Sequence, residues 1–151
     1  MLKLGPKLVL AAFFLTGLVG VKALANEAGM VKSSRGQVMI EREGRSLAVA
    51  PGTKVFSSDR ITTGADGSAG IALKDNTLLT VGPNSKLSLD RFAFDSTTHQ
   101  GALQASITQG TLAVISGKLA KAVPDSVQFR TPNAILGVRG TEFIIEAGVS
   151  N

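Results

Sequence analysis

The feature that most constrains the fold is a series of short runs in which apolar residues alternate with polar or small ones. Ala69, Ile71 and Leu73 are each separated by one residue, and Leu87 and Leu89 repeat the pattern. A period of two places alternate side chains on opposite faces of a strand. Similar runs recur at residues 37–41, 77–81, 105–108, 112–114, 127–129 and 143–145. Runs spaced about 8 to 12 residues apart predict about ten short strands and an all-β fold.

Turn-forming residues separate these runs, and no stretch has the period of a helix. Asp75-Asn76 is a two-residue link that suits a hairpin, because Asn tolerates positive φ. Strands this short must share one core, so we expect a single domain over residues 35–151, preceded by a flexible segment at residues 26–34. The domain is expected to be β-solenoid-like or sandwich-like, and no fixed repeat length decides between the two. Other breaks lie at residues 51–52, 64–67, 82–84 and 110.

The first 25 residues have the three parts of a secretory signal peptide. Residues 1–7 are short and basic, residues 8–21 are apolar, and Ala23-Leu24-Ala25 is a small-x-small cleavage site. A membrane-spanning helix needs about 20 apolar residues, and Lys22 ends this run early. We therefore expect a signal helix that is removed after Ala25, with an uncleaved anchor as the alternative. Either way, the folded part is expected in the periplasm or outside the cell.

Charge and composition argue against several classes of partner. The formal net charge is +5, but Lys3, Lys7 and Lys22 lie in the expected signal peptide, and 13 basic and 11 acidic residues remain without them. So small an excess does not indicate a nucleic-acid partner. The chain has no Cys, which excludes disulfides and thiolate metal sites. It also lacks Trp and Tyr, the rings on which sugars usually stack.

No group of residues indicates catalysis, a metal site or a cofactor. His99 is the only histidine, and Asp95 lies four residues before it. In a polar loop, that spacing does not indicate a general base with an orienting partner. The chain has no carboxylates at metal-ligand spacing and no Gly-rich phosphate loop with a Lys. We expect no catalytic, metal-binding or cofactor-binding residue, and so no enzyme.

The segment Gly137-Val-Arg-Gly140 has the Gly-x-x-Gly form of the loop by which KH domains clamp nucleic acid. A KH loop joins two helices, whereas here Pro132 precedes the segment and the alternating run at Phe143 follows it. We interpret the two glycines as turn-forming residues and Phe143 as an anchor in the core. Thr141 is expected to hydrogen-bond locally. Arg139 is expected to be exposed, as a solvated charge or as a contact for a partner.

The same region resembles the terminal motif of FecR-type domains. Residues 129–143 read F-R-T-P-N-A-I-L-G-V-R-G-T-E-F, and residues 73–87 resemble the block of that family that contains D-G-T, with Asn76 in place of Gly. Several motifs in family order make the resemblance specific, and it covers roughly residues 35–146. The matching segments are residues 51–52, 59–64, 73–87, 109–112 and 129–143.

Membership of this family would imply an all-β extracytoplasmic domain that takes part in protein–protein communication in the cell envelope. The best-known members sense an outer-membrane iron-siderophore transporter and signal through a membrane span to a cytoplasmic sigma factor. The motif residues are expected to be architectural. They are Asp75, Asn76, Thr131, Pro132, Gly137, Arg139, Gly140, Thr141 and Phe143.

Two departures from the family limit what carries over. Only seven residues precede the apolar run in this sequence, too few for the domain that binds a sigma factor, so we expect that the iron-signalling role does not carry over. Family members usually continue past this motif into a further hairpin, whereas this chain has eight residues after Phe143. We therefore expect an exposed C-terminal edge strand, which invites pairing with another chain.

Two functions follow from these expectations. The first is a non-catalytic periplasmic module that binds an envelope protein, in signalling or sensing, through the loops at residues 92–101 and 116–125. The alternative is a structural β-protein that associates with itself through the C-terminal edge or with the cell wall or surface. Neither function involves nucleic acid, a cofactor or a stable membrane span after cleavage.

Overall fold

The computed structural model describes residues 27–138 and 141–148, so the expected signal peptide, Arg139 and Gly140 lie outside the described residues. The described chain is mostly β-structure, with twelve strands in one continuous sheet. The all-β prediction is confirmed, with two strands more than the approximate number expected.

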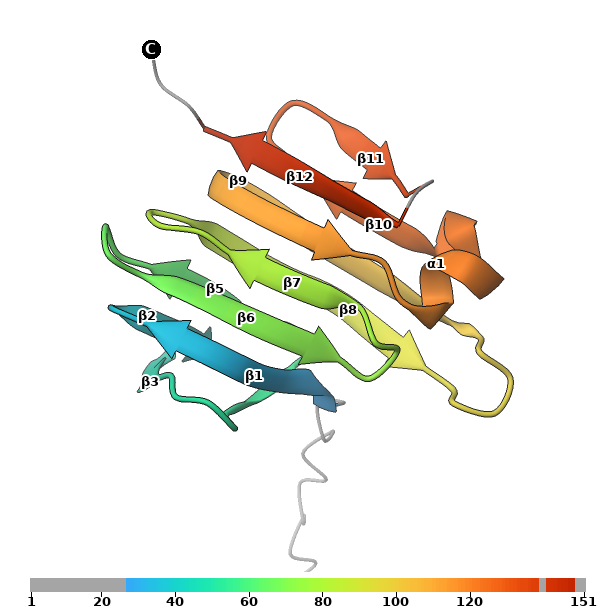
Figure 1. Ribbon diagram of the computed structural model, residues 1–151, viewed down its shortest axis with the longest axis horizontal. Helices are drawn as coiled ribbons and strands as arrows, with labels where there is room; N and C mark the ends of the chain where they lie inside the picture. Colours follow the sequence, from blue (N-terminus) through green and yellow to red (C-terminus); the bar gives the residue numbers. More distant parts are fainter. Residues whose placement is uncertain (1–26, 139–140, 149–151) are drawn as a thin grey trace, which may run out of the picture.

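The sheet curls over on itself, so that its strands lie in two layers (Figure 1). The layer nearer the viewer in Figure 1, called the front layer, ends at β12 on one side and at β4 on the other. In order across the layer, its strands are β4 (Lys54–Phe56), β1 (Glu27–Arg35), β6 (Ser68–Leu73), β7 (Leu78–Val81), the second half of β9 (Gly101–Ile115) and β12 (Glu142–Ala147).

The back layer is joined to the front layer through β9, which belongs to both. Among the described residues, every pair of neighbouring strands is antiparallel except β9 with β10. The two layers are therefore parts of one curled sheet that resembles half a barrel, rather than a regular solenoid. In order, the back layer consists of β3 (Arg45–Ala48), β2 (Val38–Arg42), β5 (Arg60–Thr63), β8 (Lys86–Phe94), the first half of β9, β10 (Val127–Arg130) and β11 (Ile135–Gly137).

Apolar side chains from the inner faces of both layers fill the space between them. Ile71, Leu79 and Val114 lie in register across three strands of the front layer, and Ile61 and Leu87 lie in register in the back layer. All five are buried. Complete burial of such a side chain contributes about 1.5 to 3 kcal/mol to folding. The apolar residues that alternate in the sequence are therefore the ones that form the inner face of this sheet.

The chain crosses between the layers along one side through turns that stack on one another. Gly64 N–H donates to the Gln37 carbonyl over 2.9 Å, and Asn84 N–H donates to the Gly64 carbonyl over 3.0 Å. Gly82 N–H then donates to the Thr111 carbonyl over 2.9 Å, at the point where β9 changes layer. These bonds join successive corners into a ladder that closes the curled side of the sheet.

The prediction of a flexible segment at residues 26–34 is wrong for residues 27–34. They lie in β1, which pairs with both β4 and β6, so the domain begins before residue 35. Close packing explains the Gly in this strand, since a Cβ at Gly29 would lie 2.2 Å from the Ala72 carbonyl oxygen. An isolated Gly in a strand marks this kind of backbone approach.

The prediction of a surface loop at residues 116–125 is also wrong. This segment contains α1 (Lys118–Ala122) and the start of the short 3-10 helix η1 (Pro124–Ser126), and Leu119 of α1 is completely buried. A five-residue helix is too short to produce a recognisable helical period in the sequence. The other expected loop is shorter than predicted, because β8 continues to Phe94 and only residues 95–100 connect it to β9.

Candidate functional site

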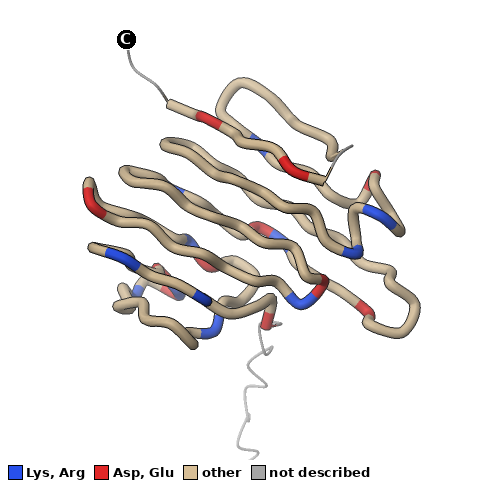
Figure 2. Tube along the Cα trace, in the orientation of Figure 1, with Lys and Arg blue, Asp and Glu red and all other residues tan. Residues whose placement is uncertain are grey.

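The outer surface of the front layer is uncharged across its centre. The strands β6 and β7 and residues 110–115 of β9 contain no Lys, Arg, Asp or Glu, and Figure 2 shows them tan along their lengths. We call this surface the outer face. Its residues, on five adjacent strands, are Met30, Gly70, Ala72, Leu78, Thr80, Ala113, Ile115 and Ile144.

Cross-strand register makes the apolar residues of the outer face continuous. Ala72 lies opposite Met30 on one side and Leu78 on the other, and Leu78 lies opposite Ile115. Leu78 and Ile115 are 42% and 44% exposed. A second row beside this one ends in Ile144, which is 67% exposed. Apolar side chains of this size, gathered on one exposed face, are typical of an interaction surface.

The outward surface of the back layer has a different character. Glu41 lies opposite Arg60 in the sheet, and their side chains are 3.9 Å apart, both half exposed or more. Asp90 accepts hydrogen bonds from Ser88 over 2.9 Å and from Ser106. Charged and hydroxyl side chains of this kind are satisfied by water and by one another. The edge strands of the back layer, β3 and β11, do expose Leu47 and Ile135, at 37% and 64%. The candidate site is the outer face, because its central strands carry no charge.

A bidentate ion pair fastens the β4–β5 corner. The Arg42 Nε donates to Asp59 Oδ1 over 2.8 Å and its Nη2 donates to Asp59 Oδ2 over 2.6 Å. Asp59 is completely buried and also accepts the Phe56 N–H over 2.9 Å. The hydrogen bonds with Asp59 raise the pKa of the Arg42 guanidinium above its ordinary value. The guanidinium also lies over the Phe56 ring, 4.5 Å from its centre.

We expect Asp59→Asn to lower the free energy of unfolding by about 2 kcal/mol, because an amide cannot accept from both guanidinium nitrogens and the backbone at once. Urea denaturation measures the loss. The control is Glu41→Gln, which removes the exposed pair with Arg60 and should change stability by less than about 0.5 kcal/mol. Equal effects of the two substitutions would contradict a structural role for the buried pair.

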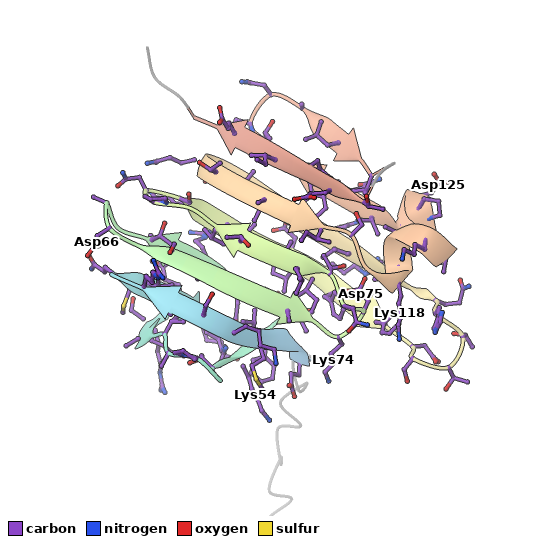
Figure 3. All side chains as sticks on the ribbon, in the orientation of Figure 1. Lys54, Asp66, Lys74, Asp75, Lys118 and Asp125 are labelled. Atoms are coloured by element: carbon purple, nitrogen blue, oxygen red, sulfur yellow. The ribbon has the colours of Figure 1, made fainter. Side chains whose placement is uncertain are left out.

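Asp75, in the hairpin between β6 and β7, has a structural role, because it accepts hydrogen bonds from the first residues of α1. Asp75 is completely buried, and its Oδ2 accepts from Thr77 Oγ1 over 2.8 Å and from Leu119 N–H over 3.2 Å. The Asp75 carbonyl accepts Lys118 N–H over 2.7 Å, and Figure 3 shows these two residues side by side. Asn76 has φ of 68°, so the predicted positive φ at this turn is confirmed.

The loop that carries His99 is closed by Asp95. Asp95 Oδ1 accepts Thr97 N–H over 2.8 Å and Thr98 N–H over 3.1 Å. These backbone hydrogen bonds, from Thr98 and then Thr97, hold the pKa of the Asp95 carboxyl below its ordinary value. The His99 ring stacks on Phe94 with 5.9 Å between ring centres. The structure therefore gives Asp95 a turn-forming role.

The family of the chain is shown by comparison with known proteins. The family model described as FecR protein matches residues 59–151, more than half of the chain. The chain belongs to the FecR family. No curated protein and no solved structure matches it. Among residues 27–138 and 141–148, no group of His, Asp or Glu could hold a metal ion, and no helix is long and apolar enough to cross a membrane.

The segment matched to the FecR family begins at Asp59 and contains most of the outer face. It covers β6, β7, β9 and β12, together with the Asp75 hairpin. The strands β1 to β4 precede it but belong to the same curled sheet. The structural unit is thus larger than the matched segment.

Two residues of the terminal FecR motif have clear architectural roles. Thr131 closes the β10–β11 turn, since its N–H donates to the Ala134 carbonyl over 2.9 Å and its Oγ1 accepts Ala134 N–H over 3.1 Å. Pro132 lies at the bend between them. Phe143 packs against the core edge-on to Phe129, with ring centres 5.6 Å apart. These observations agree with an architectural reading of the motif.

The reason predicted for Gly137 is wrong. Gly137 is the last residue of β11, its φ is not in the left-handed region, and a Cβ there would have no atom within 4 Å. Its place at the end of a strand therefore needs no glycine. Thr141 is exposed, and its carbonyl accepts Ser116 N–H over 2.8 Å. Arg139 and Gly140 lie outside the described residues, so the roles predicted for them stay predictions.

Proposed function

We propose that this FecR-family chain is a non-catalytic, exported module that binds another protein of the cell envelope through its outer face. The family and the all-β sheet support a role in envelope signalling or sensing. The signal-like first 25 residues support export to the periplasm or beyond.

One observation supports the proposal most directly, which is the lack of charge across the outer face. The centres of protein interfaces are depleted in charged residues relative to the rest of the surface. The uncharged centre of the face consists of three strands, β6, β7 and the second half of β9, spaced about 4.8 Å apart. The charged residues of the front layer lie on its outer strands, at Lys54 of β4, at Glu27, Lys32 and Arg35 of β1, and at Glu142 and Glu146 of β12.

The binding surface proposed here differs from the one predicted from the sequence, which consisted of the loops at residues 92–101 and 116–125. Residues 117–119 are held against the Asp75 hairpin, because Gly117 N–H donates to Thr77 Oγ1 over 3.2 Å and Leu119 N–H donates to Asp75. A segment so firmly attached adapts poorly to a partner. The outer face, by contrast, presents exposed apolar side chains on paired strands.

We expect the double substitution Leu78→Lys with Ile115→Lys to reduce capture of the envelope partner at least about tenfold, because two charges would replace two paired apolar side chains of the outer face. Both side chains are partly exposed, so the folded state should survive. The measurement is quantitative mass spectrometry of proteins recovered with a tagged full chain, beside its thermal unfolding midpoint.

The control is Met39→Lys, which places one added lysine on the outward surface of the back layer, where Met39 lies opposite Thr62. It should leave capture unchanged. If Met39→Lys abolishes capture and the outer-face variant does not, the back layer binds the partner and the proposal is wrong. If capture yields only copies of this chain, the self-associating structural function is supported instead.

A further inference from the structure

The last strand of the front layer has one partner among the strands that the structure describes. β12 pairs antiparallel with β9 from Glu142 opposite Ile115 to Ala147 opposite Gly110. Its other edge therefore presents backbone N–H and C=O groups to which a further strand could bond. Figure 1 shows β12 at the end of the front layer, with β11 at the same end of the molecule.

The outward side of β12 has a defined charge pattern. Glu142, Ile144 and Glu146 alternate with the inward residues, and all three are exposed. Each glutamate lies two residues from Ile144, so a strand paired along this edge would meet acidic, apolar and acidic positions in turn. Opposite charges on directly facing residues stabilise such a pair, and like charges destabilise it.

A mostly apolar pocket lies beside the same edge, between β11 and β12. The pocket has a volume of about 310 Å³, and its lining consists of residues 136–138 and of Glu142, Phe143, Ile144 and Ile145 of β12. Leu136 is 37% exposed, whereas Val138 and Ile145 are buried. Inward side chains of an added strand would therefore enter an apolar space.

We propose that the free edge of β12 accepts an extended segment of a partner protein in which a basic residue, three apolar residues and a second basic residue follow one another. In antiparallel pairing, the central residue lies opposite Ile144 and the two basic residues lie opposite Glu142 and Glu146. The second and fourth residues enter the pocket beside Phe143 and Ile145. This inference rests on the proposed function, because it specifies part of the partner that the outer face binds.

The charge pattern argues against a second copy of this chain at the same edge. If two copies paired with Ile144 opposite Ile144, Glu142 of each would lie directly opposite Glu146 of the other. Two such like-charge pairs are destabilising. A basic segment converts the same two positions into attractive pairs, so charge complementarity favours a partner with basic flanks.

The test uses the full chain labelled with ¹⁵N and a synthetic peptide in which Lys-Val-Ile-Val-Lys lies between glycine–serine flanks. We expect the peptide to shift the amide resonances of β12, and its dissociation constant to rise with salt concentration. The matched peptide Glu-Val-Ile-Val-Glu has the same apolar centre. It should bind at least about tenfold more weakly.

The charge-reversed variant Glu142→Lys with Glu146→Lys separates pairing from nonspecific attraction. Both residues are exposed, so the variant should fold, and its preference between the two peptides should invert. A second variant, Ile144→Pro, removes an N–H from the strand and should weaken both peptides without this inversion. Shifts confined to other strands, or a preference that does not invert, would overturn the proposal.

The failure of this inference is distinguishable from failure of the proposed function. Leu78→Lys alone lies on β7, which is not adjacent to β12, and it should reduce capture of the whole partner while leaving the peptide at β12 bound. If that variant leaves capture intact while the peptide still binds β12, the outer-face proposal fails and the edge proposal stands. If the chain sediments as a dimer that Ile144→Pro dissociates, and the peptide does not shift the amides of β12, a second copy occupies the edge and this proposal fails.

Discussion

Replacing Gly110 by alanine should lower the free energy of unfolding by about 4 kcal/mol, the largest loss expected from any single substitution proposed for this chain. Gly110 lies where β9 leaves the back layer and enters the front layer. Its φ is 93°, and a Cβ there would lie 2.0 Å from Ser85 Oγ and 2.5 Å from Ser85 Cα. An alanine thus combines backbone strain with a clash against main-chain atoms.

Ser85 cannot move aside without further loss. It is completely buried, its N–H donates to Thr63 Oγ1 over 2.9 Å, and its Oγ accepts Thr111 N–H over 3.0 Å. Thr63 Oγ1 in turn donates to the Gly82 carbonyl over 2.6 Å. Moving Ser85 would break bonds that hold three corners of the sheet together, and each buried group left without a partner costs about 1 to 3 kcal/mol.

The matched control is Gly52→Ala. Gly52 has φ of 95°, almost the same as Gly110, but a Cβ there would have no atom within 4 Å. It should therefore show the backbone strain alone, about 1 kcal/mol. Urea denaturation of both variants measures the difference. Equal losses would show that the packing of Gly110 against Ser85 contributes nothing to stability.

Replacing Asp75 by alanine should cost about 3 kcal/mol and release α1 from the sheet. The carboxylate accepts three hydrogen bonds, from the Thr77 N–H and hydroxyl and from Leu119 N–H, the last of these 44 residues along the chain. Removing it leaves these donors buried without partners. Because Leu119 is part of the core, the loss should extend to the packing between α1 and β9.

Hydrogen exchange checks this expectation. In Asp75→Ala, the amides of residues 117–119 should exchange much faster than in the unsubstituted chain, beside the lower unfolding midpoint. The control is Asp66→Ala, which removes a single exposed hydrogen bond of 3.3 Å from Gln37 N–H and should cost less than about 1 kcal/mol. Unchanged protection at residues 117–119 would contradict the role assigned to Asp75.

Local signals in the sequence predicted much of the fold. Alternation around Ile71 and Leu87 identified strands, because their inner side chains share one core. Asn76 identified a hairpin, because its turn needs positive φ. Two segments were missed for physical reasons. β1 contains Gly29, a residue that usually disfavours strands, but here the Ala72 carbonyl leaves no room for a side chain. α1 is too short to have a helical pattern in the sequence, and its start is held by a hydrogen bond to the Asp75 carboxylate, which is remote in the chain.

The outer face could not be predicted from the sequence. Met30, Leu78, Ile115 and Ile144 belong to four different strands and are adjacent only through the pairing of the sheet. Each looks unremarkable alone, because single exposed apolar residues are common on protein surfaces. Which residues share a face depends on long-range register, and no local period contains that information.

The measurement that tests the central claim most directly is photo-crosslinking in living cells from single positions of the full chain. A photoreactive residue in place of Leu78 or Ile115 should link the chain to one dominant envelope protein, because these are two exposed, directly paired apolar positions of the outer face. The same residue in place of Met39, on the back layer, should give no such product. Crosslinks from Met39 alone, or only self-linked species from Leu78, would contradict the claim that the outer face binds an envelope partner.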